Sequence, residues 1–344
     1  MKEYLQKLCA GVNLDQAEAK IAMSLIMEGE ATPSQVAAFL VALKMKGETA
    51  GELYGCASAM RERATAVRSR HSGLTDTCGT GGDGKGTFNI STLAALIASG
   101  AGLPVAKHGN RSVSSRCGSA DVLEAMGVRL ELTPEQMGAC LDEVGFAFLY
   151  APLLHQAMRH AAVPRREVGV RSVFNLLGPL TNPAGATRQV LGVYAPGPAA
   201  CLAQVLLLLG TEKAMVVHGS DGSDELTLAG ETLVYEIKEG SLRCFLLNPE
   251  DVGLERSQNT IPGGSPKENA ALMLEVLMGR RGSHRDVSLL NAAAALYVGG
   301  LAEDLRHGVI MAENSIDSGA ALAKLEELLK FTERCDTSAQ TNCG

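Results

Sequence analysis

The sequence predicts an α/β fold made of a small N-terminal all-helical domain and a large α/β domain with a mostly parallel, mixed central sheet flanked by helices. Three observations lead to this prediction. The chain has 344 residues, which suits two domains better than one small domain. Its first seventy residues carry only helical patterns. After residue 72, short β-like runs alternate with longer helical runs, as in parallel sheets covered by helices.

Helix start signals divide the first domain, which we place at residues 1–70. Each signal is a polar capping residue followed three positions later by Glu or Gln, with apolar residues at helical spacing behind it. The pairs are Asn13 with Gln16, Thr32 with Gln35 and Thr49 with Glu52. This segment contains little chemistry, so we expect a packing or dimerisation module, joined by part of residues 164–183.

The second domain, at residues 71–331, begins where the alternation starts. Buried strands are predicted at 74–78, 103–107, 190–194 and 214–218, with helices at 92–99 and 199–209. Two further runs, 232–237 and 242–247, flank a Lys-Glu-Gly-Ser turn and predict a hairpin, so we expect a mixed edge. The polar segment 332–344 is expected to form a flexible tail.

Composition argues against several classes of protein. The net charge of −7 gives no global basic field for nucleic acid. The nine cysteines are odd in number, widely spaced and without a CxxC pair, which favours reduced thiols in a cytoplasmic protein over a disulfide framework or zinc site. The N-terminus lacks an apolar signal core, and the most apolar stretch, 199–209, is too short to span a bilayer. We therefore expect no nucleic-acid partner and no membrane partner.

A glycine-rich loop, Gly-Thr-Gly-Gly-Asp at residues 79–83, follows the first predicted strand. Such a loop exposes backbone N–H groups at the carboxyl end of a strand, where open α/β sheets bind ligands and where N–H groups can surround phosphate oxygens. It matches neither the P-loop nor the dinucleotide fingerprint. Taken alone, a plain tight turn explains these residues equally well.

Residues 89–92, Asn-Ile-Ser-Thr, stand just before an Ala/Leu-rich helix. Ser or Thr at this place commonly caps a helix. The same hydroxyl and N–H groups also suit an anion or a metal ion, and the two interpretations are compatible.

A longer polar run, from Lys107 to Ser119, follows the second predicted strand. It combines cations, an amide, hydroxyls and glycines, which make a poor core and a good anion site. The alternative is a solvated surface loop. His108 lies among these groups, and we give it a binding role and no catalytic one.

Adjacent carboxylates occur at residues 221–225, Asp-Gly-Ser-Asp-Glu, after a predicted strand. Oxygen ligands of this kind suit Mg²⁺, which usually arrives with substrate phosphates. The alternative is a turn with solvated acids.

Two neighbouring arginines, Arg165 and Arg166, follow Pro164, and Arg171 is near them. A guanidinium can grip a carboxylate with two parallel hydrogen bonds. Since adjacent side chains on a helix face different ways, at most one of the pair should enter a given site.

Taken together and in this order, these segments resemble the anthranilate phosphoribosyltransferases over about residues 1–330. The resemblance rests on residues 79–83, 89–92, 107–121, 171–180 and 224–225. It implies transfer of phosphoribose from phosphoribosyl pyrophosphate to the amine of anthranilate, in tryptophan biosynthesis. It also implies Mg²⁺ as cofactor, a hinged cleft between the domains and a homodimer formed through the helical domain.

The resemblance implies roles for individual residues. The donor site would comprise Gly79, Gly82, Asp83, Thr87, Asn89, Ile90, Ser91, Thr92, Lys107, His108, Gly109, Asn110, Arg111, Ser112, Val113, Ser114, Ser115 and Ser119. Gly79, Asn110 and Arg165 would hold anthranilate, and Ser91, Asp224 and Glu225 would bind Mg²⁺. An aromatic amine is nucleophilic when neutral, so we expect no dedicated acid or base, with Lys107 and Asp83 acting electrostatically.

Two alternatives share this fold. A pyrimidine nucleoside phosphorylase also has a glycine loop and a Lys/Ser anion site, but it does not usually present the Lys-His-Gly-Asn-Arg-Ser run or the Asp-Glu pair. A non-catalytic nucleic-acid-binding relative should show a basic face and a degraded site, whereas here the net charge is negative and the motifs are intact.

Overall fold

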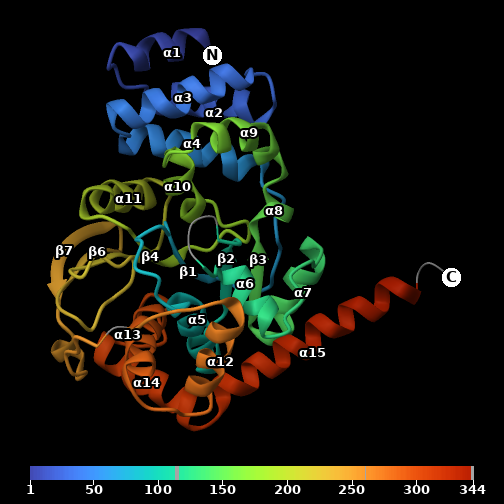
Figure 1. Ribbon diagram of the computed structural model, residues 1–344, viewed down its shortest axis with the longest axis vertical. Helices are drawn as coiled ribbons and strands as arrows, with labels where there is room; N and C mark the ends of the chain where they lie inside the picture. Colours follow the sequence, from blue (N-terminus) through green and yellow to red (C-terminus); the bar gives the residue numbers. More distant parts are fainter. Residues whose placement is uncertain (113–115, 260, 342–344) are drawn as a thin grey trace.

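The computed structural model describes residues 1–112, 116–259 and 261–341, and it confirms the predicted fold class. A group of helices lies at one end of the molecule, and a sheet with flanking helices forms the larger body (Figure 1). We use the term helical unit for the first four helices together with α9 and α10, which pack against them. Its members are α1 (Lys2–Cys9), α2 (Gln16–Met27), α3 (Pro33–Lys46), α4 (Ala50–Arg63), α9 (Arg159–Val168) and α10 (Val173–Leu177).

Side-chain caps begin the early helices. Thr32 and Thr49 cap α3 and α4 as predicted, each accepting a hydrogen bond from the backbone N–H three residues later. For α2 the predicted start at Asn13 is wrong, because Asp15 is the cap and Glu18 completes its capping box. The side chain of Asn13 instead accepts a hydrogen bond from Lys46 Nζ at 2.8 Å.

Seven strands within the described residues form one sheet in the order β3-β2-β1-β4-β5-β6-β7. The first five in this order run parallel, and β6 and β7 continue antiparallel as the predicted hairpin. The strands are β1 (Thr75–Gly79), β2 (Val105–Gly109), β3 (Phe146–Tyr150), β4 (Arg188–Gly192), β5 (Lys213–Gly219), β6 (Thr232–Lys238) and β7 (Ser241–Leu247). The sequence-based positions hold to within two residues, but β3 was missed.

Two layers of helices cover the sheet. One face packs against α5 and α13, and the other packs against α11, which in turn contacts α4 of the helical unit (Figure 1). Side chains of β5 alternate accordingly, because Met215 joins the first core and Val216 the second. The remaining helices are α5 (Ile90–Gly100), α6 (Ser119–Ala125), α7 (Pro134–Val144), α8 (Ala151–Leu154), η1 (Gln156–Met158), η2 (Gly178–Leu180), α11 (Pro196–Leu208), η3 (Pro249–Val252), α12 (Pro266–Leu277), α13 (Ser283–Val298), α14 (Leu305–Asp317) and α15 (Ala320–Thr341). Among the described helices, none is long and apolar enough to cross a membrane.

The last helix, α15, occupies the segment for which a flexible tail was expected from Thr332 onwards. Phe331 is buried and Thr332 is only 1 % exposed, with its Oγ1 accepting a hydrogen bond from the Arg129 backbone at 3.4 Å. Because the segment is polar in composition, its sequence did not indicate that Phe331 and Thr332 pack against the rest of the protein. The helix continues from there to Thr341. Residues 342–344 lie outside the described part of the chain.

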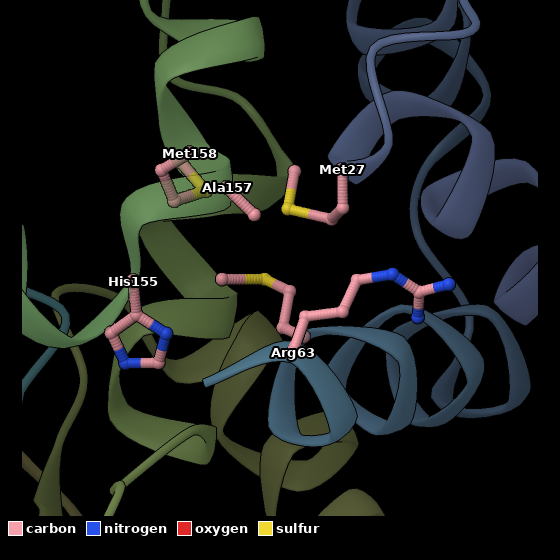
Figure 2. Close-up of a pocket in the computed structure, with 6 residues that line it drawn as sticks. Met27, Arg63, His155, Ala157 and Met158 are labelled. Carbon is pink, nitrogen blue, oxygen red and sulfur yellow. The ribbon is translucent and has the colours of Figure 1, made fainter. Parts of the chain in front are cut away.

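The helical unit meets the body of the protein at a tightly packed junction beside α8 and η1. Met27 and Arg63 of the helical unit face His155 and Met158 across a small space that is too tight to admit a substrate (Figure 2). A side-chain hydrogen bond also joins the two parts, because Arg61 Nε donates to the Leu180 carbonyl at 2.6 Å. We conclude that this space is a packing feature of the junction.

Two buried histidines lie next to each other here, His155 at the edge of this space and His108 beside it. The ring centroids of His108 in β2 and His155 lie 5.1 Å apart. Each ring has a hydrogen bond to backbone, at Gly178 for His108 and at Thr181 for His155, and each Nε2 is buried without a partner among the described atoms. Burial lowers the pKa of His108 to about 3 and that of His155 to about 4. Both imidazoles are therefore neutral at pH 7.

We expect this pair to make folding stability fall below neutral pH. An unfolded histidine has a pKa near 6.5, so below that pH the unfolded chain binds protons that the folded chain excludes. As far as these two histidines are concerned, the free energy of unfolding is highest above about pH 6.5. It decreases as the pH falls towards 4 and then 3. At pH 5 the loss is about 2 kcal/mol per histidine.

Urea unfolding at pH 7 and pH 5 measures this loss. His155→Asn keeps an amide that can donate to Thr181 but removes one titrating ring, so the difference between the two pH values should shrink. Met158→Ala, at the same junction, should lower the midpoint equally at both pH values. An undiminished pH difference in His155→Asn contradicts the assignment.

Candidate functional site

The predicted glycine loop leaves the carboxyl end of β1 and is held at three successive residues. Thr80 N donates to the Gly192 carbonyl at 2.9 Å, and Gly81 N donates to Asp224 Oδ2 at 2.9 Å. The Gly82 carbonyl accepts a hydrogen bond from the Arg171 guanidinium. Gly81 and Gly82 have positive φ angles of 63° and 75°, which glycine adopts without strain. The loop therefore lies against the acidic segment.

Three carboxylates gather beside this loop. Asp224 and Glu225 follow β5, and Asp83 comes from the loop itself. Burial and then the Asp83 charge raise the pKa of Asp224 to about 7. Burial and then the Asp224 charge raise the pKa of Glu225 to about 8, against the opposing effect of Lys107. The cluster therefore holds more negative charge than the protein compensates.

Ser91 links the acidic cluster to the start of α5. Its N–H donates to Glu225 Oε1 at 3.2 Å, and its Oγ accepts a hydrogen bond from Lys107 Nζ at 3.3 Å. Asp83 Oδ2 is buried and has no partner among the described atoms. Three carboxylates and a hydroxyl form an oxygen donor set that suits Mg²⁺. Within the described residues, no group of three or more His, Cys, Asp or Glu side chains is arranged to hold a metal ion by itself.

Lys107 is 2 % exposed and lies at the centre of this arrangement. Its Nζ donates to the carbonyl and the hydroxyl of Thr77 in β1, as well as to Ser91. Burial lowers the pKa of Lys107, and the carboxylates of Asp76 and Glu225 oppose that effect. Its three hydrogen bonds hold the amino group between β1 and the start of α5.

Asn89, at the N-terminus of α5, is fixed by two other segments. Its Oδ1 accepts hydrogen bonds from Asn269 Nδ2 at 2.9 Å and from Cys117 Sγ at 3.3 Å. Thr92 is buried, and its Oγ1 has no partner among the described atoms. The side chain of Ile90, which the resemblance placed in the donor site, lies in the core, and its N–H donates to Phe88.

Strand alternation separates two residues that the resemblance placed in one donor site. Lys107 faces Thr77 and Ser91, whereas His108 faces His155 on the other side of the sheet. Gly109 lies where a Cβ would come within 2.6 Å of Phe148, so the strand can end only in glycine there without displacing that ring.

Among the residues that follow β2, some side chains are exposed and others already form hydrogen bonds or ion pairs within the protein. Asn110 is exposed, and its carbonyl accepts hydrogen bonds from Ala120 N at 3.2 Å and Ser119 Oγ at 3.3 Å. The Arg111 guanidinium is bound to Asp121 and Glu124, so its charge is engaged outside the acidic cluster. Ser112 N donates to Asp121 Oδ2 at 3.1 Å, and Thr87 bridges to Pro262. Val113, Ser114 and Ser115 lie outside the described residues.

Arg165 lies near the end of α9, in the helical unit. Its guanidinium carbon is 5.9 Å from the Phe174 ring centroid, and burial lowers its pKa. Among the described residues, no carboxylate forms an ion pair with it, whereas Arg166 is exposed. This half-buried cation lacks a counter-ion within the described part of the protein, which suits a carboxylate ligand.

Sequence reasoning missed several residues that hold the site in place. Gly192 ends β4, and a Cβ there would collide with the Asp224 carbonyl, so the acidic segment can lie against the sheet only because glycine is present. Asp76 accepts hydrogen bonds from His108 N at 3.1 Å and Asn182 Nδ2 at 2.8 Å. These contacts join residues far apart in the chain, so no local pattern indicates them.

Comparison with known proteins identifies both parts of the chain. Residues 2–64 match the helical bundle domain of a glycosyl transferase family, and residues 71–322 match the a/b domain of the same family. An anthranilate phosphoribosyltransferase of Pelotomaculum thermopropionicum is 55% identical over 333 residues, covering 96% of both chains. That of Moorella thermoacetica is 54% identical over 334 residues, covering 97% of this chain and 98% of its own.

Solved structures agree with this match. Anthranilate phosphoribosyltransferase from Thermus thermophilus superposes with a TM-score of 0.90 at 47% identity, over 96% of this chain and 99% of its own. The enzyme from Saccharomyces cerevisiae in complex with PRPP and Mg gives a TM-score of 0.89 at 30% identity, over 97% of this chain and 98% of its own. The chain therefore belongs to the anthranilate phosphoribosyltransferases of this glycosyl transferase family.

Proposed function

We propose that this chain transfers phosphoribose from 5-phosphoribosyl 1-pyrophosphate to the amine of anthranilate, giving N-(5-phosphoribosyl)anthranilate and pyrophosphate in tryptophan biosynthesis. The observation that supports it most strongly is the meeting of the glycine loop, Lys107 and the acidic cluster at the strand ends. This arrangement offers N–H donors, a fixed cation and a metal-binding set to a doubly phosphorylated sugar. Formation of product from anthranilate, and not phosphorolysis of thymidine, is the expected outcome of a direct assay.

The donor would lie over the glycine loop, with its pyrophosphate facing the acidic cluster. Bound Mg²⁺, held by Asp224, Glu225 and Ser91, would neutralise charge that develops on the leaving pyrophosphate. Lys107 is held in place by its hydrogen bonds to Thr77 and Ser91, so its positive charge would stabilise the same charge without reorganising. Asp83 lies close enough to Asp224 to raise its pKa, and its unpartnered Oδ2 is available to the same cation.

The acceptor needs orientation more than activation. The amine of anthranilate is nucleophilic when neutral, so no side chain has to remove a proton before attack. Arg165 would hold the carboxylate of anthranilate by paired hydrogen bonds, with Asn110 and Gly79 on the facing domain completing the acceptor site. Correct alignment of the amine and the anomeric carbon can contribute roughly 7–11 kcal/mol. Closure of the helical unit over the sheet would exclude water, which competes for the same carbon.

We also propose that the protein is a cytoplasmic homodimer assembled through the helical unit. Four large apolar side chains of the first three helices and their connections are exposed, which favours a covered surface there. They are Val12, Ile21, Val41 and Met45.

Arg165→Ala should raise the KM for anthranilate by about tenfold to a hundredfold and leave the KM for the donor nearly unchanged. The reason is that a charged hydrogen-bond partner of the acceptor carboxylate alone is removed. Steady-state kinetics with each substrate varied in turn measures the split. Arg166→Ala, the exposed neighbour, should behave as wild type, and equal effects of Arg165→Ala on both KM values refute the clamp.

The double variant Asp224→Asn with Glu225→Gln should reduce turnover by roughly a thousandfold at saturating Mg²⁺, because several kcal/mol of charge stabilisation are lost. Its thermal stability without Mg²⁺ should equal or exceed that of wild type, since two repelling carboxylates become neutral. Asp221→Asn, which keeps an acceptor for Ser223, should remain active. A double variant that retains Mg²⁺-dependent turnover disproves the metal assignment.

Ile21→Glu combined with Met45→Glu should convert the dimer into monomers of half the mass, because charges in an apolar interface are costly. Sedimentation equilibrium measures the mass. Ile310→Glu, an equally exposed site on α14, should leave the mass unchanged. Wild-type protein that sediments as a monomer contradicts the proposal.

A further inference from the structure

Arg171 joins the helical unit to the glycine loop. It lies in the short connection between α9 and α10, after the left-handed Gly169 and next to Ser172, the residue before α10. Both flanking helices pack onto α3, so the backbone of Arg171 belongs to the helical unit. Its side chain nevertheless ends on the other part of the protein.

The guanidinium of Arg171 is fixed on two sides. It donates to the Gly82 carbonyl, and its central carbon lies 4.0 Å from the centroid of the Tyr194 ring. A Cβ at Gly82 would overlap the guanidinium, so the close approach requires glycine there. Guanidinium groups bind well in this way, with one face on an aromatic ring and the N–H groups donating in the plane.

Tyr194 connects this contact back to the sheet. It follows β4, and its N–H donates to Thr80 Oγ1 at 3.1 Å. Thr80 is held by β4 and Gly81 by Asp224, so these two anchors belong to the α/β domain. Arg171, which belongs to the helical unit, supplies the third anchor, at the Gly82 carbonyl.

The anchor at Gly82 also determines the direction of the next N–H group. In a planar trans peptide the C=O and N–H point in opposite directions. With the Gly82 carbonyl directed towards Arg171, the N–H of Asp83 must point away from that side chain. The orientation of this donor, and of the Asp83 side chain beside it, therefore depends on the Arg171 contact.

We infer that Arg171 is a positioning residue for the phosphoribosyl donor: it sets the glycine loop in its donor-binding conformation according to the position of the helical unit. The inference rests on the proposed function for the identity of the donor. It assigns Arg171 to the donor side, whereas Arg165, six residues earlier on the same unit, serves the acceptor. The alternative is that Arg171 binds a phosphate of the donor directly.

Three variants of the full-length protein test the inference. Arg171→Gln removes the cation and the stacking plane. Arg171→Lys keeps a positive charge but not the planar group that stacks on Tyr194. Arg159→Gln, an exposed arginine at the start of α9, is the matched control. The two measurements are steady-state kinetics with each substrate and amide hydrogen exchange of peptides covering residues 79–89 in the protein without substrates.

The expected result for Arg171→Gln is a KM for the donor raised by about tenfold or more, with the KM for anthranilate changed less than about threefold. Exchange of the loop amides in the free protein should be faster by about tenfold, because an anchor is lost before any ligand binds. Arg171→Lys should restore neither value fully, and Arg159→Gln should match wild type.

Other outcomes overturn the inference. Loop exchange that is unchanged in free Arg171→Gln shows that the contact does not hold the loop. A donor KM that Arg171→Lys restores, without slower loop exchange, assigns Arg171 to a phosphate. Wild-type protein that makes no product from anthranilate refutes the proposed function, and the exchange measurement still decides whether Arg171 positions the loop.

Discussion

The site depends on a buried ammonium group, that of Lys107 in the middle of β2. Lys107 has hydrogen bonds to Thr77 and Ser91, and the carboxylates of Asp76 and Glu225 stabilise its charge. A buried cation without such partners would be strongly destabilising. The surrounding carboxyl groups outnumber this single cation, and the raised pKa values of Asp224 and Glu225 show that an excess of negative charge is unfavourable here without a further cation. A divalent cation would remove that excess, which makes its binding beside the carboxylates favourable.

Backbone packing, more than local turn chemistry, determines where the acidic pair lies. A side chain at Gly79 would come within 2.6 Å of Asp224 Oδ2, and one at Gly192 would collide with the Asp224 backbone. β1 and β4 are neighbours in the sheet, so these two glycines form one flat surface on which the segment after β5 rests. The site is therefore built from three strand ends that pack without intervening side chains.

The sequence predicts the fold class and most strands because buried strands and capped helices have strong local patterns. β3 was missed although Gly145 ends α7 in the left-handed conformation, because Phe146–Tyr150 is a short apolar run that passes directly into α8. The predicted site residues lie close together where their motif follows the carboxyl end of a strand. His108 did not join Lys107, because strand alternation turns neighbours to opposite faces, and Arg111 is engaged by Asp121 and Glu124. Asn269 and Asn182 act across long sequence separations, which periodicity cannot reveal.

The segment from α9 to η2 explains why a reaction of two substrates needs two structural units. It interrupts the alternation of strands and helices, joins the helical unit, and then returns to the sheet at β4. It carries both Arg165 and Arg171 on one short stretch of chain. The donor groups on the sheet are fixed by glycine contacts and buried charge, so they cannot move towards the acceptor without breaking the core. Under the proposed function, relative alignment of the two substrates would then come from the position of the helical unit, and this single segment would convey that position to both sites.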